Sequence, residues 1–192
     1  NFLSIIPMRP SLLLASLLLA ASLPAAHLTL RQDAATHTIS VYRDNVAAPI
    51  LTQNAKPDFR PYLHPIVSPD GKSVLTEFSP GHHKHQTGLY WGLTRLNGRD
   101  YFHNPSNGYW RRISSAPVVA QGSEVKWTTT YHLLDAAGKA IMAETQLWTM
   151  QDKVESYVLE LEWTGEAIAD LTISEYAYGG LFLRMPWRTG ME

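Results

Sequence analysis

Apolar and polar residues alternate along the second half of the chain, and this pattern predicts β-strands. Residues 125–134 place Val, Trp, Thr, Tyr and Leu at every second position, the period of a strand that buries one face. Two further runs span residues 141–150 and 154–163, and short polar turns join the three runs. Strands connected in this way form an antiparallel meander, which we expect to be one sheet of a sandwich.

The first half of the chain is less regular because prolines interrupt it. Short strands are predicted at residues 28–31, 38–43, 74–78 and 89–96, and one or two more at residues 171–184. No long segment repeats its apolar residues with the period of a helix. We therefore expect an all-β protein with the architecture of an antiparallel β-sandwich.

The N-terminus has the pattern of a secretory signal peptide. Arg9 precedes an apolar run at residues 12–19, and small residues end the segment at 22–26. The alternative is an uncleaved anchor, which the shortness of the run disfavours. We expect residues 1–26 to be upstream residues plus a signal peptide and residues 27–192 to form the sandwich domain. The protein would then be secreted, in the periplasm, with no membrane span after cleavage.

The composition narrows the chemistry that is open to this chain. Its 192 residues include 8 His and no Cys, which excludes disulfides, thiolate zinc sites, iron–sulfur clusters and cysteine nucleophiles. The formal net charge is −1, so the sequence predicts no basic surface for nucleic acid. Histidine is therefore the main source of reactive or metal-binding groups.

The histidines concentrate in one stretch of the chain. His83 and His85 stand two positions apart between Pro-Gly and Gly-Leu, and in an extended segment both rings point to the same side. This spacing suits a substrate or a metal ion. We expect His64, His83 and His85 to be the catalytic residues. A metal site would need a third ligand, for which His64 and His103 are the candidates. The alternative is a solvated loop without a chemical role.

Aromatic residues gather in the same stretch, together with polar groups that suit a sugar. Rings stack on the C–H faces of a sugar, while Arg and Asn side chains bond its hydroxyls. The alternative is that these rings belong to the core of the sandwich. The residues predicted to bind substrate are Arg60, Tyr62, Tyr90, Trp91, Asn97, Glu175 and Arg184.

The last two of these residues flank an apolar run that contains two adjacent glycines. Glu175 lies within a strand-like pattern and Arg184 ends it. A carboxylate and a guanidinium in this position form either a structural ion pair or an acid with an anion-binding partner.

Four blocks of the sequence resemble a known family. They are residues 60–65, 68–71, 80–89 and 97–102, and the Gly-Leu-x-x-Arg element at residues 180–184 also matches loosely. Their order and spacing are similar to those of secreted bacterial proteins of unknown function that are labelled "methane oxygenase PmoA". Gln86 departs from the pattern, because the family usually has a further histidine there.

The resemblance implies a fold and a class of substrate. The label itself is a misnomer on this interpretation, because the membrane methane monooxygenase needs several apolar spans and none follows the signal peptide here. The family is more similar to the β-sandwich proteins of the galactose mutarotase type, which handle sugars. Its members continue beyond the length of this chain, which implies a C-terminally truncated, incomplete domain.

Four functional hypotheses follow. In the first, the protein acts on carbohydrate through the His-rich loop, with His83 and His85 as acid–base groups. In the second, His64, His83 and His85 hold copper, zinc or iron in a metal-dependent oxidoreductase. In the third, the protein is a non-catalytic sugar-binding module, and in the fourth the chain is inactive without further strands. The first three hypotheses predict a small-molecule partner, and none of the four predicts binding to nucleic acid.

Overall fold

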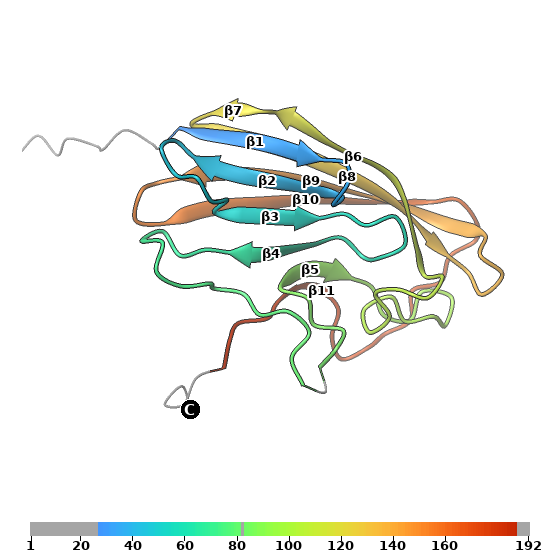
Figure 1. The fold of residues 1–192 in the computed structure, drawn as a ribbon. Helices are drawn as coiled ribbons and strands as arrows, with labels where there is room; N and C mark the ends of the chain where they lie inside the picture. Colours follow the sequence, from blue (N-terminus) through green and yellow to red (C-terminus); the bar gives the residue numbers. More distant parts are fainter. Residues whose placement is uncertain (1–26, 82, 188–192) are drawn as a thin grey trace, which may run out of the picture.

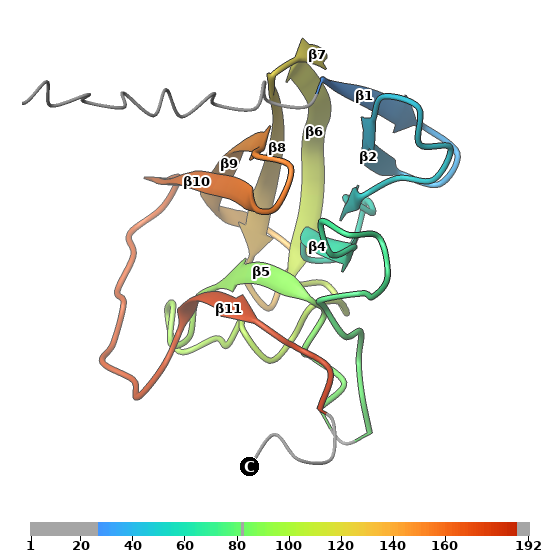
Figure 2. The same cartoon turned by 90° about the vertical axis from the view of Figure 1, so that its left-hand side faces the viewer.

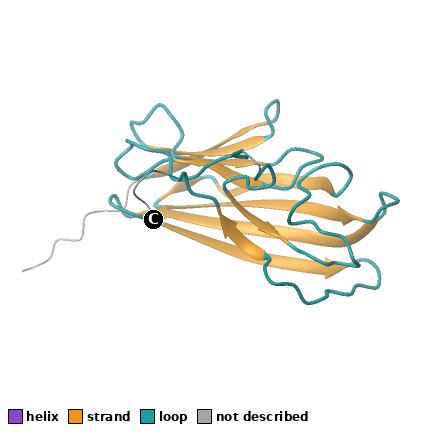
Figure 3. Cartoon of the chain, turned by 90° about the horizontal axis from the view of Figure 1, so that it is seen from below, coloured by secondary structure: helices purple, strands orange, loops and turns teal. Residues whose placement is uncertain are grey.

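Two antiparallel sheets face each other in the computed structural model, which describes residues 27–81 and 83–187 (Figure 1). The expected signal peptide at residues 1–26 lies outside the described residues. The described chain consists of strands and loops without a helix (Figure 3), so the prediction of an all-β sandwich is confirmed. It follows that no described segment forms the long apolar helix that a helical membrane span requires.

The larger sheet has seven strands in the order β11-β5-β4-β3-β2-β1-β7. Consecutive strands pair from β1 to β5, whereas β7 and β11 come from distant parts of the chain and form the two edges. The strands are β1 (Leu28–Asp33), β2 (Thr38–Arg43), β3 (Leu51–Asn54), β4 (Tyr62–Ile66), β5 (Leu89–Gly92), β7 (Gln121–Gly122) and β11 (Gly180–Leu183).

The smaller sheet has four strands in the order β10-β9-β8-β6. Three of them are the predicted meander, because β8 pairs with β9 and β9 with β10 along almost their whole length. Gly138 has a φ of 78° in the first turn, a conformation that glycine adopts without steric cost. The strands are β6 (Trp110–Val119), β8 (Glu124–Leu134), β9 (Ala140–Asp152) and β10 (Tyr157–Ala167).

The structure differs from the sequence prediction where the apolar pattern is weak. β6 was not predicted, because most of its residues are exposed and its large apolar side chains, such as Ile113, do not alternate with buried ones. The predicted strand at residues 74–78 makes only isolated bridges at Val74 and Phe78. Of residues 171–184, only Gly180–Leu183 forms a strand, and the exposed segment before it connects the two sheets.

The core lies between the sheets and is apolar except along its centre. The predicted inner face of β8 is fully buried from Val125 to Leu133. Polar side chains cross this core on β9: Gln146 donates a hydrogen bond to Glu144 over 2.7 Å and accepts one from the Trp148 indole over 3.0 Å. These bonds satisfy the amide, as a buried polar group requires.

Glu144 is the buried acid of this row. Its side chain is 1% exposed, and burial raises its pKa from 4.5 to about 7. One of its carboxylate oxygens, Oε2, accepts no hydrogen bond from the described residues. Folding therefore favours the protonated form of Glu144, because a buried carboxylate loses its hydration.

We predict that Glu144 makes the free energy of unfolding fall as the pH rises from about 5 to 7. In this window the unfolded carboxyl releases its proton while the buried one retains it. Glu144→Gln removes that ionisation, so its stability relative to the wild-type protein is expected to improve by roughly 3 kcal/mol between pH 4.5 and pH 8. Urea denaturation at a series of pH values measures this difference.

Glu166→Gln is the matched control, because Glu166 is exposed near the end of β10. It makes the same chemical change without altering a buried group. A stability difference for Glu144→Gln that does not change with pH would show that burial does not raise the pKa of Glu144.

Candidate functional site

The candidate site is built from two loops beside one end of the seven-stranded sheet. One loop joins β4 to β5 and the other joins β5 to β6, and both gather beside β5 and β11 (Figure 2). Gly88 allows the first loop to return to the sheet: its φ is 87°, and a Cβ atom there would lie 2.3 Å from the carbonyl oxygen of Leu63. Only glycine fits this close approach of two backbones.

Arg60 fastens the two loops to each other. Its side chain is 0% exposed, and its guanidinium stacks on the Tyr90 ring with 3.5 Å between Cζ and the ring centroid. One terminal nitrogen donates to the carbonyl of Phe102, in the second loop. The other donates to the carbonyl of His85 and, over 3.2 Å, to the hydroxyl of Thr87, both in the first loop. The planar guanidinium fits such divergent acceptors.

Burial lowers the pKa of Arg60 to about 10, so the side chain still carries a positive charge at neutral pH. Among the described residues, Arg60 forms no ion pair. Its hydrogen bonds go to carbonyls and a hydroxyl instead. The site therefore contains a buried positive charge without a carboxylate directly bonded to it.

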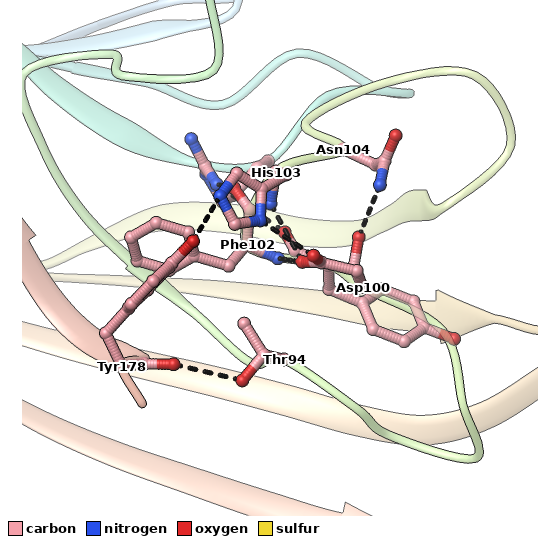
Figure 4. A network of polar contacts seen from close by, with 8 residues as sticks. Thr94, Asp100, Phe102, His103, Asn104 and Tyr178 are labelled. Atoms are coloured by element: carbon pink, nitrogen blue, oxygen red, sulfur yellow. Dashed lines mark hydrogen bonds and ion pairs between the residues drawn. The ribbon is translucent and has the colours of Figure 1, made fainter. Parts of the chain in front are cut away.

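A chain of hydrogen bonds joins Asp100, His103 and Tyr178 (Figure 4). Asp100 Oδ2 lies 2.7 Å from His103 Nδ1, and Asp100 Oδ1 accepts the backbone N–H groups of Phe102 and His103 over 3.0 Å each. His103 Nε2 lies 2.9 Å from the Tyr178 hydroxyl. Thr94 secures Tyr178 by donating to its carbonyl over 3.0 Å.

The direction of these bonds follows from the carboxylate. An ionised Asp only accepts hydrogen bonds, so Nδ1 of His103 carries the proton and donates it to Asp100. In the neutral form of the ring, Nε2 is then an acceptor, and the Tyr178 hydroxyl donates to it. Tyr178 is 49% exposed, and the neighbouring Tyr176, whose ring centroid lies 5.1 Å away, is the main cause that raises its pKa. It is therefore a protonated phenol at neutral pH.

His85 packs against His103, with 4.5 Å between the ring centroids. Burial lowers the pKa of His85 to about 4, and repulsion from Arg60, and from His103 whenever that ring is protonated, acts in the same direction. His85 is consequently neutral at physiological pH. His83 lies 6.2 Å from it, centroid to centroid, and its Nδ1 is 3.5 Å from the amide nitrogen of Gln86.

These groups face a cavity of about 430 Å³, which we name the histidine cavity. Its lining combines three histidines, an amide and a phenol with the apolar side chains of Phe102, Leu181 and Phe182. Its size falls in the range of small-molecule sites. The polar lining residues are His83, His85, Gln86, His103 and Tyr178.

His64 does not line the histidine cavity, unlike the other two predicted catalytic histidines. Its Nδ1 lies 2.9 Å from the hydroxyl of Thr76, and its ring packs on Phe78. Burial lowers its pKa. Among the described residues, no group of three or more His, Asp or Glu side chains is arranged to hold a metal ion. The predicted ligand set of His64, His83 and His85 is therefore not brought together.

Four predicted substrate-binding residues support the fold around the site. Tyr62 and Tyr90 are buried, and the side chain of Trp91 stacks on Trp163 with 4.9 Å between centroids. Arg60 lies beneath the cavity rather than in its wall. The structure thus assigns them packing and positioning contacts.

The other three predicted substrate-binding residues lie outside the histidine cavity. Asn97 donates to the carbonyl of Asp170 over 3.0 Å and accepts the N–H of Thr172 over 2.8 Å, which secures the segment between β10 and β11. Glu175 is exposed in that segment rather than inside a strand. Arg184 pairs with Glu77 over 2.9 Å, so the predicted pair of Glu175 and Arg184 does not form.

The sequence interpretation missed Asp100 and Tyr178 as site residues. Asp100 and His103 stand three positions apart, a local signal that could have joined them. Tyr178 lies 75 residues further along the chain, and only the crossing of the connecting segment brings it to His103. No pattern within a single strand predicts that contact.

Comparison with known proteins identifies the family of the chain. A model of a family of unknown function, DUF6807, matches residues 39–191. The chain belongs to the DUF6807 family. The match covers both site loops and Tyr178 of this DUF6807 protein, and it confirms that its relatives form a family without an assigned function. No curated protein and no solved structure matches the chain significantly.

We predict that Arg60→Lys destabilises this DUF6807 protein by about 3 kcal/mol, because buried carbonyls in both loops lose their charged donor. Lysine keeps the positive charge but has neither the planar face for Tyr90 nor donors in a fork. Urea denaturation measures the loss. Arg111→Lys is the control: Arg111 is exposed and donates to the Gly138 carbonyl, so its substitution should cost less than about 0.5 kcal/mol. Equal losses of stability in the two variants would show that Arg60 does not stabilise the two loops.

We also predict that the His85 ring of the folded protein gains a proton only near pH 4. Because the folded pKa lies below the unfolded one, this ring contributes stability above about pH 6.5 that is lost as the pH falls toward 4. The ring carbon signals in an NMR titration report the midpoint, and the urea-unfolded protein gives the reference near 6.5. Equal midpoints in both states would contradict the expectation.

Proposed function

We propose that this DUF6807 protein binds a sugar in the histidine cavity and that Asp100, His103 and Tyr178 move a proton at the bound ring. The observation that carries the proposal is the hydrogen-bonded chain from the Asp100 carboxylate through His103 to the Tyr178 hydroxyl, which ends in the cavity wall. Such a chain holds a base in one tautomer and aims it at a proton donor.

The lining of the cavity supports a sugar as the ligand. Phe102 and Phe182 offer rings to the C–H face of a pyranose, and their centroids lie 5.6 Å apart in an edge-on arrangement. Gln86, His83 and the neutral His85 offer donors and acceptors for hydroxyl groups. A cavity lined by both apolar and polar side chains matches a ligand that has both kinds of surface.

The proposed proton transfer balances without an oxidant or a metal. The Tyr178 hydroxyl passes its proton to Nε2 of His103, and the Tyr178 oxygen accepts a proton from a hydroxyl of the sugar. The positive charge that develops on His103 is stabilised by Asp100. When the deprotonated anomeric oxygen forms a carbonyl group, the bond between C1 and the ring oxygen breaks, and the reverse transfer delivers the proton to the ring oxygen. The relay thus serves opening of the sugar ring, and the same steps in reverse close it. Neutral His85 can accept or donate a hydrogen bond beside it.

The second candidate is a sugar-binding module without catalysis, which the same cavity walls support equally. Only the first candidate function predicts turnover of the bound sugar. The metal-dependent alternative gains no support from the described residues, because no three ligating side chains converge there.

The signal-like pattern at residues 1–26 supports a location outside the cytoplasm, and we extend the proposal to a secreted, periplasmic protein.

We predict that Tyr178→Phe slows the proton transfer by about 100-fold, since this substitution removes only the hydroxyl that relays the proton. The ring stays in the cavity wall, so sugar affinity should fall less than tenfold. Interconversion of the two anomers of glucose, galactose and mannose, followed by polarimetry or proton NMR, measures the rate. Saturation-transfer NMR measures binding of the same sugars.

Tyr42→Phe is the matched control, because Tyr42 lies on β2 beside Arg31 and away from the cavity. Thermal melts of both variants check that they fold. Binding without turnover in the native protein would favour the module, and equal rates for native protein and Tyr178→Phe would refute the relay. If no sugar binds, the whole proposal fails.

A further inference from the structure

A second cavity adjoins the histidine cavity. It meets the proton relay only at His103, which lines both cavities. It has a volume of about 320 Å³ and shares His85 and His103 with the first cavity. Its other lining residues come from the loops before β4, β5 and β6 and include Phe59, Phe78 and Lys84. We name it the lysine cavity. The edge-to-face pair of His85 and His103 therefore lies where the two cavities meet.

The lysine cavity combines aromatic and polar lining residues, as the first cavity does. Phe59 and Phe78 both pack on Tyr62, with centroid distances of 5.8 Å and 5.4 Å, and Phe78 is 43% exposed. An aromatic ring exposed to this extent at a cavity wall offers a stacking surface. Asn104 and Asn107 supply amides.

Lys84 gives this cavity its charge. Its ammonium group donates to the carbonyl of Ser79 over 3.3 Å and forms no ion pair with a described residue. The lining of the two cavities contains no Asp or Glu. Arg60, buried beneath the histidines, adds a second positive charge, and the carboxylate of Asp100 behind His103 is engaged by three N–H donors.

We propose that the lysine cavity is a second sugar subsite that takes a unit with a carboxylate, so that the ligand is an acidic disaccharide or longer acidic saccharide. Resting on the proposed function, this assignment names the substrate class of the same site. The neutral unit occupies the histidine cavity, and the linkage between the units passes His85 and His103. Lys84 bonds the carboxylate of the acidic unit, since an unpaired ammonium in an acid-free cavity favours an anion.

The test compares sugars that differ by one feature at a time. Isothermal titration calorimetry of the native chain uses glucose, cellobiose and cellobiouronic acid, and then galactose, galactobiose and digalacturonic acid. In at least one series the acidic disaccharide is expected to bind at least tenfold more tightly than the neutral disaccharide, and the neutral disaccharide more tightly than the monosaccharide. The acidic preference should weaken as salt is raised from 50 to 500 mM, because screening reduces the attraction.

Lys84→Gln is expected to abolish the acidic preference, whereas Lys72→Gln should retain it. Lys72 is the matched control because its side chain is exposed, pairs with Asp70 and lies outside both cavities. Phe78→Ala is expected to remove the gain from the second sugar unit. Thermal melts identify any variant that fails to fold. In that case the affinities of the wild-type protein for the series of sugars decide between the outcomes.

The outcomes separate this inference from the proposed function. Binding of monosaccharides without a gain for disaccharides would overturn the second subsite and leave the proton relay intact. Equal affinity for neutral and acidic disaccharides, or an acidic preference that survives Lys84→Gln, would overturn the assignment of Lys84. Turnover of monosaccharides that depends on Tyr178 would support the relay whichever of these results is found.

Discussion

The buried guanidinium of Arg60 is the interaction on which the rest of the site depends. In the described chain, the loops that carry His85 and Phe102 contain no strand of the two sheets, so their backbone polar groups need other hydrogen-bond partners. Arg60 supplies donors to both loops from one rigid plane, and Tyr90 beneath it fixes that plane. An unpaired guanidinium or carbonyl group is costly in the interior. The hydrogen bonds from Arg60 to the carbonyls of His85 and Phe102 therefore stabilise a single arrangement of the two loops.

The electrostatics of the site also depend on the hydrogen-bond partners of Arg60. A carboxylate partner would have neutralised Arg60, but its bonds go to carbonyl oxygens, and its charge lowers the pKa of His85. A neutral His85 beside an oriented His103 gives the cavity two imidazoles in different roles. One is held by Asp100 as an acceptor for Tyr178, and the other is available to a ligand. Such division between neighbouring groups is common in acid–base sites.

The strands differ in how far their sequence predicts them. In the meander, β8 and β9 bury one face and β10 half-buries alternate residues, so polar and apolar residues alternate and the turns have their usual residues. In β6 the neighbouring strand supplies the hydrogen bonds while most side chains face water, so no alternation marks it. The segment before β11 looked like a strand because of its Ile and Tyr residues, yet it spans the gap between the sheets and stays exposed.

The sequence by itself determined the all-β class, the three long strands of the meander, and the stretch of histidines and rings from which the cavity is built. Those features depend on local alternation and local composition, which the chain records residue by residue. Tertiary structure alone decided which of these residues meet. Folding buried Tyr90 and Arg60 beneath the loops, turned His64 toward Thr76, and brought Tyr178 across 75 residues to His103. Contacts of that kind arise from the crossing of loops over a sheet edge, and no periodic pattern encodes them.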